Sequence, residues 1–254
     1  MTPEPMPAQQ ELRAFYDDAY SSDEEQGRVY ARWRALSARG KADHIVALCA
    51  RVGIHPERTL DVGCGDGVLL AELRARGWPG RLDGVEITQA AVDIAAGRSE
   101  IDSVALYDGE HLPAGDHEYD LGIASHVLEH VPHPPAFLAE MARACRAVLV
   151  EVPLEDNVSA RRAVKREHAH QIGHLQQLNR ASMRAMVAAA GLRVAAELDD
   201  PLPRPVHTFF AQTPRQRAIK TGTWLVRAGV HRGAPDLARR LFTVHYACLC
   251  LPQP

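Results

Sequence analysis

The chain has 254 residues, its formal net charge at pH 7 is −3, and 46% of its residues are hydrophobic. This length allows one large α/β domain with a sizeable core, and the small net charge gives no general attraction to nucleic acid. The start is acidic and rich in proline, unlike a signal peptide, and no apolar run approaches the ~18 residues of a transmembrane helix. We therefore expect a cytoplasmic protein without a membrane span. The abundance of arginine and alanine is typical of a GC-rich bacterial genome.

The N-terminal region divides into a predicted tail and a predicted helical segment. Residues 1–10 are polar and proline-rich, which favours a disordered tail, and residues 11–254 are predicted to form a single domain. Residues 11–53 have the pattern of helices with aromatic interruptions. Apolar side chains at helical spacing over residues 42–52 predict a helix that packs on a sheet.

A glycine-rich stretch, residues 59–77 (TLDVGCGDGVLLAELRARG), is central to the chain. It reads as a strand (59–62), a turn with three glycines and a helix (68–76). Glycine lets the backbone turn tightly and lets a ligand come close, and the following helix start offers free N–H groups. Asp61 precedes the glycines, and Glu86 ends the next strand (81–86), where a carboxylate would grip a ribose diol.

Strands and helices then alternate, which predicts an α/β fold with a parallel sheet and helices on both faces. We predict helices at 88–98, from 134 and at 180–190, and strands at 103–106, 119–124, 147–152 and 192–198. Two inserts interrupt this pattern, at 153–178 and at 199–243, the second with helices near 216–228 and 235–241. Residues 244–251 form a last apolar strand.

The five cysteines are scattered and have neither metal-ligand nor disulfide spacing. We expect them to be thiols, and we expect Cys248 and Cys250 to share one buried strand face.

Three motifs resemble the class I S-adenosylmethionine-dependent methyltransferases. LDVGCGDG followed by GVEI resembles the family's cofactor loop, YDGEHLP (107–113) its adenine-binding segment, and SHVLEHV (125–131) its motif after the fourth strand. An NAD(P)-dependent oxidoreductase is the rival interpretation. It is disfavoured because its fingerprint is GxGxxG, whereas this loop is GxGxG with Asp61 and Asp66 beside it. A carboxylate suits the ammonium of a methionyl group and repels a pyrophosphate.

The resemblance implies a Rossmann-like seven-stranded sheet in the order 3-2-1-4-5-7-6, with strand 7 antiparallel, and S-adenosylmethionine as the cofactor. It implies that an N-terminal helical lid (11–53) covers the cofactor, so Tyr16, Tyr20 and Trp33 are lid candidates, although ordinary helix packing also explains them. Asp108 matches the adenine-binding aspartate, but an aspartate before glycine also forms turns. The implied cofactor-binding residues are Asp61, Gly63, Cys64, Gly65, Gly67, Glu86, Ile87, Asp108, Gly109, Glu110 and Ser125.

A hydroxyl acceptor needs a general base, and histidine is the usual choice near neutral pH. His126 lies just past the fourth strand. His174 belongs to a Gly-His pair that resembles one found in many small-molecule members of the family. Both are candidates, and packing or helix capping is the alternative for His126. Glu151, Glu155, Asp156 and the His168-x-His170 pair lack diagnostic spacing, so we expect no metal.

The acceptor is suggested by charge, because the inserts form a basic cap on an acidic core. Basic residues in the inserts are Arg161, Arg162, Lys165, Arg166, Arg204, Arg215, Arg217, Lys220, Arg227, Arg232, Arg239 and Arg240. This favours O-methylation of an anionic or sugar-like small molecule, such as a glycan, a nucleotide-linked sugar or a secondary metabolite. A solvated arginine-rich surface is the alternative. N- or C-methylation and a non-catalytic cofactor-binding subunit also stay open. The Asn/Asp-Pro-Pro-Tyr signature of enzymes that methylate nucleic-acid amino groups is absent, so we expect no nucleic acid.

Overall fold

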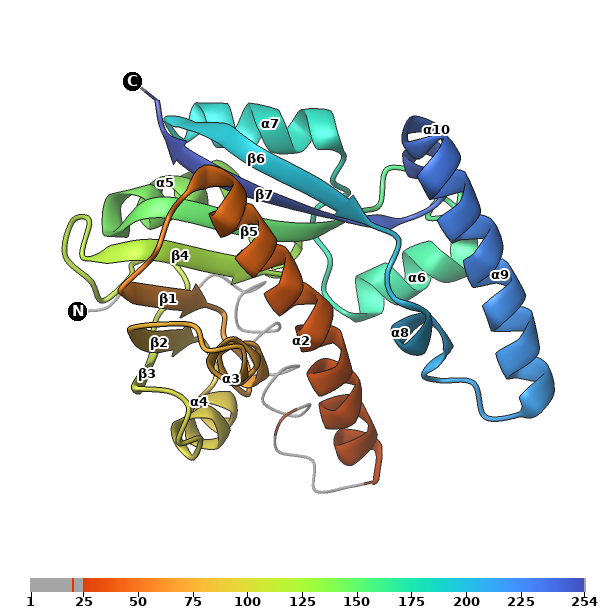
Figure 1. The fold of residues 1–254 in the computed structure, drawn as a ribbon, viewed down its shortest axis with the longest axis horizontal. Coiled ribbons are helices and arrows are strands. Elements are labelled where there is room, and N and C mark those ends of the chain that lie inside the picture. Colours follow the sequence, from red (N-terminus) through yellow and green to blue (C-terminus); the bar gives the residue numbers. More distant parts are fainter. Residues whose placement is uncertain (1–19, 21–24, 254) are drawn as a thin grey trace.

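The computed structural model describes Tyr20 and residues 25–253 and contains one seven-stranded sheet (Figure 1). The strand order is β3-β2-β1-β4-β5-β7-β6, which confirms the predicted Rossmann-like topology. The strands are β1 (Arg58–Val62), β2 (Arg81–Glu86), β3 (Ser103–Leu106), β4 (Tyr119–Ser125), β5 (Cys145–Leu154), β6 (Leu192–Asp200) and β7 (Val244–Pro252). Strands β1 to β5 pair in parallel, whereas β7 runs antiparallel to both β5 and β6.

Helices cover both faces of the sheet, and each face has its own apolar core. One core joins the sheet to the helices α2 and α3, through side chains such as Ile45 and Leu70, and the other joins it to α5 and α7, through Met141 and Met183. The helices are α2 (Glu25–Val52), α3 (Val68–Ala75), α4 (Gln89–Ala96), α5 (Pro134–Ala144), α6 (Ala163–Gln171), α7 (Arg180–Ala189), α8 (Arg204–Thr208), α9 (Pro214–Gly233) and α10 (Pro235–Leu241), with a 3₁₀ turn at Leu128–His130.

Local sequence signals explain where these helices begin and end. Asn179 and Ser182 form a reciprocal capping box at the start of α7, and Thr213 and Gln216 do the same for α9. Gly191 follows α7 with a φ of 73°, the left-handed conformation in which glycine commonly ends a helix. All five cysteines are free and buried, and Cys248 and Cys250 lie two residues apart on β7, as predicted.

The helix α2 differs from the expected series of helices with aromatic interruptions, because it is one continuous helix from Glu25 to Val52. Tyr30 and Trp33 continue its turns, since aromatic residues lower helix propensity without breaking a helix. The predicted tail (1–10) and the lid candidate Tyr16 lie outside the described residues.

The two inserts meet beyond one end of the sheet, where α6, α8, α9 and α10 gather (Figure 1). Backbone hydrogen bonds from Val158 to Arg240 and from Ser159 to Leu241 tie the first insert to the second. The indole N–H of Trp224 donates to the carbonyl of Leu202 at 2.9 Å and fixes α9 against the segment after β6. The inserts therefore form a helical cap. Of the helices that the structure describes, none combines the length and apolar character that crossing a membrane requires.

Gly122, in the middle of β4, is packed so tightly that a side chain has no room. A Cβ there would lie 2.6 Å from Sγ of Cys145 and 3.2 Å from the methyl group of Met141. We expect Gly122→Ala to lower the free energy of unfolding by about 1–3 kcal/mol, because overpacking forces the neighbours to shift. Chemical denaturation followed by circular dichroism measures this change.

Two variants control this prediction. Cys145→Ala in the same chain should restore part of the loss, because it removes the clashing sulfur. Gly222→Ala on α9, where nothing lies within 4 Å of the new Cβ, should be neutral or stabilising. Equal losses at both glycines would contradict the packing argument.

Candidate active site

A cavity of about 1600 Å³ opens at the carboxyl ends of the parallel strands, beneath α2. Residues from the glycine-rich loop, from the ends of β2, β4 and β5, from α2 and from both inserts line it. In open α/β sheets, ligands bind outside the carboxyl ends of the strands, where the strand order reverses. Here that point lies between β1 and β4.

The glycine loop approaches its neighbours so closely that two positions need glycine. Gly63 has a φ of 74°, and a Cβ there would lie 2.6 Å from a methyl group of Val127. Gly65 has a φ of 56°, and its Cβ would lie 2.5 Å from the hydroxyl of Tyr20. Both lie in the left-handed region that disfavours side chains. Gly63, Cys64 and Gly65 all line the cavity.

Glu86, at the end of β2, joins the loop to the second strand. Its Oε2 accepts a hydrogen bond from the backbone N–H of Gly65 at 2.8 Å, and its Oε1 accepts one from that of Ile87 at 2.6 Å. The Glu86 side chain is buried and lines the cavity. Its carboxylate is therefore fixed in the position where the sequence predicts a ribose contact.

Asp61 also lines the cavity, at the end that contains the glycine-rich loop. Burial raises the pKa of Asp61 to about 7, with Lys41 acting in the opposite direction and Glu86 in the same one. A bound cation beside Asp61 would favour its ionised form. Asp61 therefore suits a ligand that carries a positive charge.

Asp108 has the turn-forming contacts that the sequence analysis left open. Its Oδ1 accepts hydrogen bonds from the backbone N–H groups of Glu110 and His111, each at 2.7 Å. These bonds and the His111 ring outweigh partial burial and lower the pKa of Asp108. Asp108 and Gly109 nevertheless line the cavity.

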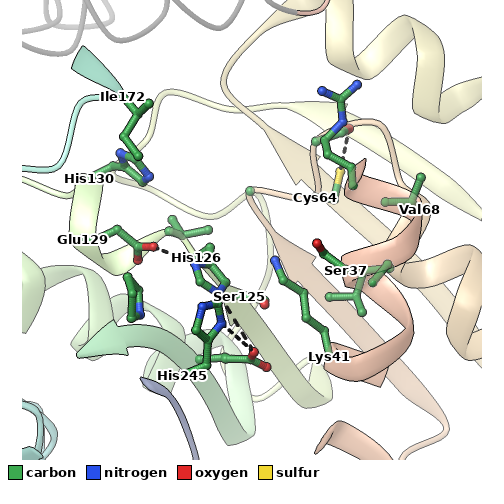
Figure 2. Close-up of a pocket in the computed structure, with 18 of the residues that line it drawn as sticks. Ser37, Lys41, Cys64, Val68, Ser125, His126, Glu129, His130, Ile172 and His245 are labelled. Atoms are coloured by element: carbon green, nitrogen blue, oxygen red, sulfur yellow. Dashed lines mark hydrogen bonds and ion pairs between the residues drawn. The ribbon is translucent and has the colours of Figure 1, made fainter. Parts of the chain in front are cut away.

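The end of the cavity toward the inserts is rich in histidine (Figure 2). Nδ1 of His126 lies 3.0 Å from Oε1 of Glu129, and its Nε2 lies 3.0 Å from Nδ1 of His245. His126 has a φ of 61°, and its backbone N–H donates to the carbonyl of Glu151 at 2.8 Å. Burial lowers the pKa of His126 to about 4, helped by Lys41 and His245 and opposed by Glu129. The imidazole is therefore neutral at pH 7.

His174 belongs to a second group on the same wall. Its Nδ1 lies 2.7 Å from Oε2 of Glu155, and its ring meets that of His130 edge to face at 4.9 Å. Burial lowers the pKa of His174, but the hydrogen bond and charge of Glu155 outweigh it, so the pKa is raised.

A third histidine, His44 on α2, contacts both the fifth and the sixth strands. Its Nδ1 lies 3.2 Å from Oε2 of Glu151, and its Nε2 lies 3.3 Å from Oδ2 of Asp200. These two carboxylates outweigh burial and raise the pKa of His44 to about 10, so the imidazole is charged at pH 7. The contacts position α2 over the cavity.

Comparison with known proteins agrees with this architecture. The family model described as a methyltransferase domain matches residues 30–197, which is well over half of the chain. The chain belongs to the methyltransferase-domain family. The prediction that the chain is an S-adenosylmethionine-dependent methyltransferase is thereby confirmed. The prediction that S-adenosylmethionine is the cofactor is confirmed with it.

Individual relatives of this methyltransferase are distant. The ubiquinone biosynthesis O-methyltransferase of Neisseria meningitidis serogroup C (strain 053442) is 27% identical over 145 residues, which are 51% of this chain and 59% of that protein. The chain thus matches less than two thirds of that relative's length. The geranyl diphosphate C-methyltransferase from Streptomyces coelicolor A3(2) has a TM-score of 0.67 at 14% identity, covering 99% of this chain and 100% of that one. Magnesium protoporphyrin IX methyltransferase from Synechocystis PCC 6803 has a TM-score of 0.61 at 15% identity, covering 96% and 100%. The two structures share the fold.

The structure brings most of the predicted site residues to one cavity. Its lining includes Asp61, Gly63, Cys64, Gly65, Glu86, Ile87, Asp108, Gly109, Ser125, His126 and His174, and the lid candidates Tyr20 and Trp33. Gly67 and Glu110 are not part of it. Gly67 precedes α3 with a φ of 74°, and a Cβ at this position would lie 2.4 Å from Ile101. Glycine is therefore required here by the turn that leads into the helix.

The cavity residues that were not among the predicted site residues include Lys41, His44, Glu129 and His245. Glu129 belongs to the LEHV motif, so the sequence contained a signal that could have identified it as a site residue. His245 is 119 residues from His126, and only the insertion of β7 beside β5 brings the two together.

Glu86 gives a direct test of the cofactor end. We expect Glu86→Ala to weaken binding of S-adenosylhomocysteine by about 1–3 kcal/mol, because charged hydrogen bonds are lost. Isothermal titration calorimetry measures the affinity. Glu57→Ala, at an exposed position before β1 and outside the cavity lining, is the matched control. Unchanged affinity in Glu86→Ala would remove this residue from the site.

Proposed function

We propose that this methyltransferase transfers a methyl group from S-adenosylmethionine to a hydroxyl oxygen of a small molecule, with a histidine as general base. The cofactor supplies an electrophilic methyl group. The carboxylates of Asp61, Glu86 and Asp108 fit its ammonium, ribose hydroxyls and adenine amino group in chemistry. The observation that carries the proposal is the Glu155–His174 pair on the cavity wall.

His174 has the arrangement that a general base needs. The Glu155 carboxylate accepts the Nδ1–H of a neutral ring, which leaves the lone pair on Nε2. No hydrogen-bond partner of that Nε2 is found among the described residues. A carboxylate that orients one ring nitrogen and raises the pKa makes the other nitrogen a better proton acceptor. We therefore assign the acceptor's hydroxyl proton to Nε2 of His174.

His126 is the second candidate for the base, and its contacts make it the weaker one. The neutral ring donates its Nδ1–H to Glu129, so its Nε2 lone pair faces Nδ1 of His245 at 3.0 Å. Both nitrogens are thus occupied, and the pKa near 4 makes Nε2 a poor proton acceptor. His126 fits better as a residue that positions or polarises the acceptor.

Oxygen as the methylated atom is supported by the name of the Neisseria relative, an O-methyltransferase. The histidine base gives independent support, because a hydroxyl must lose its proton as the new bond forms, whereas a free amine already carries a lone pair. The proposed acceptor is therefore any member of the class of hydroxylated small molecules.

The cavity lining gives less support for an anionic acceptor than for a hydroxylated one. Of the basic residues in the two inserts, Lys165 lines the cavity, and the other eleven do not. The lining also contains the carboxylates of Asp61, Asp66, Glu86, Asp108, Glu129, Glu151, Glu155 and Asp200. The alternative of a solvated arginine-rich surface therefore suits most of the insert. We keep an anionic or sugar-like acceptor as a proposal in which Lys165 holds the anionic group.

His174→Ala tests the base. We expect kcat to fall by about 10²–10⁴-fold, because proton removal loses its acceptor, while the affinity for S-adenosylhomocysteine stays unchanged. Turnover of a screened panel of hydroxylated acceptors, at saturating cofactor, measures the effect. His55→Ala, at an exposed position before β1, is the matched control. Wild-type turnover by His174→Ala would exclude His174 as the base.

The pH dependence of kcat gives a second test. A base with a raised pKa stays protonated, and inactive, to a higher pH than free histidine, so kcat should rise with pH through a midpoint above 6.5. Glu155→Gln removes the charge that raises this pKa, and we expect the midpoint to move to lower pH. A midpoint that is the same in both proteins would contradict the role of Glu155.

A further inference from the structure

Three side chains that are far apart in the sequence meet at the end of the cavity near the inserts. They are His126 after β4, Glu151 on β5 and His245 on β7. Figure 2 labels the two histidines. Nε2 of His126 lies 3.0 Å from Nδ1 of His245 and 3.9 Å from Oε1 of Glu151, and Nδ1 of His245 lies 3.7 Å from the same oxygen. Two nitrogens and one oxygen thus form a compact triangle.

We propose that this triangle is a binding site for one divalent transition-metal ion, with Nε2 of His126, Nδ1 of His245 and Oε1 of Glu151 as its protein ligands. A point equidistant from three atoms with these spacings lies about 2.1 Å from each, which is within the range for Zn–N and Zn–O bonds. Two imidazoles and one carboxylate also suit Fe²⁺, Mn²⁺ or Co²⁺. Mg²⁺ is a poorer match, because it prefers oxygen ligands.

The surroundings of the triangle support the proposal, because they orient two of its ligand atoms, Nε2 of His126 and Oε1 of Glu151, toward its centre. Metal-binding histidines usually donate their other N–H to a carboxylate or carbonyl group. Nδ1 of His126 lies 3.0 Å from the Glu129 carboxylate, so the ring presents the Nε2 lone pair to the triangle. The second oxygen of Glu151 lies 3.2 Å from His44, and His44 in turn contacts Asp200. Two of the three ligands are thus held in place by outer partners, and metal binding replaces the hydrogen bond between His126 and His245.

Charge and solvent access also fit a cation. Glu151 is 1% exposed, whereas the side chains of His126 and His245 keep 22% and 15% of their surface accessible. All three line the cavity, whose described lining holds eight carboxylates against Arg34, Lys41, Lys165 and the charged imidazole of His44. An ion held by three protein atoms keeps open positions toward the cavity, where an acceptor oxygen fits. A bound ion would lower the pKa of an acceptor hydroxyl that occupied such a position.

The effect of the ion on an acceptor hydroxyl rests on the proposed function, but metal binding itself does not. The sequence analysis expected no metal, because no spacing in the chain suggested one. The inference arises from β7, which places His245 opposite Pro153 of β5, two residues from Glu151. Nothing in local spacing indicates such a meeting of distant segments.

A titration with Co²⁺ tests the site without any acceptor or turnover. Chelator-treated protein should bind one equivalent of Co²⁺ with the visible absorption of a four- or five-coordinate ion, and Zn²⁺ should displace it. His245→Asn and Glu151→Gln should weaken binding by about 100-fold or more, since loss of an outer partner alone costs 10–100-fold. His44→Gln, which removes such an outer partner, should cost about 10–100-fold. His55→Ala should bind like the wild type.

Two further variants separate the site from its neighbours and from simple unfolding. Glu129, His130 and His174 form another compact group nearby. His130→Gln should retain Co²⁺ binding if the ion lies in the proposed triangle. His245→Cys supplies a different ligand, so it should retain binding and add a thiolate-to-cobalt charge-transfer band that the wild type lacks.

Absence of Co²⁺ binding in the wild type would overturn the proposal. So would binding that survives in His245→Asn, or binding that is lost in His130→Gln and kept in His245→Asn. Binding of S-adenosylhomocysteine, measured on the same samples, tests the methyltransferase function separately. A protein that binds S-adenosylhomocysteine but no Co²⁺ would refute the metal site and leave the proposed function standing.

Discussion

Burial of the Glu151 carboxylate is the constraint on which the arrangement around the cavity depends. This side chain is 1% exposed near the end of a central strand, and a buried charge is very costly unless it is paired. Contacts with His44, His245 and His126 outweigh the burial and hold its pKa well below the usual range. These partners come from α2, from the last strand and from the loop after β4. One carboxylate thus fixes the positions of three segments that surround the cavity.

The cavity combines two chemically different ends on one sheet edge. At one end, backbone N–H groups and fixed carboxylates surround the glycine loop, which suits a ligand with a positive charge and a diol. At the other end, imidazoles alternate with carboxylates, which suits proton transfer and metal binding. Lys41 acts on both ends, since its charge lowers the pKa of Asp61 and that of His126. The charge of a single side chain on α2 therefore acts on both ends of the cavity.

The methyltransferase resemblance predicted the sheet order, whereas the alternation of apolar strands and helices predicted only a parallel α/β sheet with helices on both faces. The glycine turn and Glu86 at the end of the next strand located the loop, because both are local patterns. Most strand and helix limits differ from prediction by no more than two residues, as at β5, which begins at Cys145 and not at residue 147, whereas α9 continues to Gly233, five residues beyond the predicted end. The histidine-rich end of the cavity was less predictable. The His126–His245 contact depends on the register of β7, and the continuity of α2 through Tyr30 and Trp33 depends on packing that a weak helical pattern does not reveal.

The antiparallel insertion of β7 also has a consequence for the order in which the protein is made. β7 fills the place between β5 and β6, so until residue 244 has been synthesised both of those strands have an unpaired edge. Exposed strand edges invite pairing with other chains, and long-range strand pairing is slow. His245 is the second residue of β7, so the histidine-rich end of the cavity is completed as this strand begins to dock. The nascent chain thus carries a complete glycine-rich loop well before the histidine-rich end of the cavity is complete.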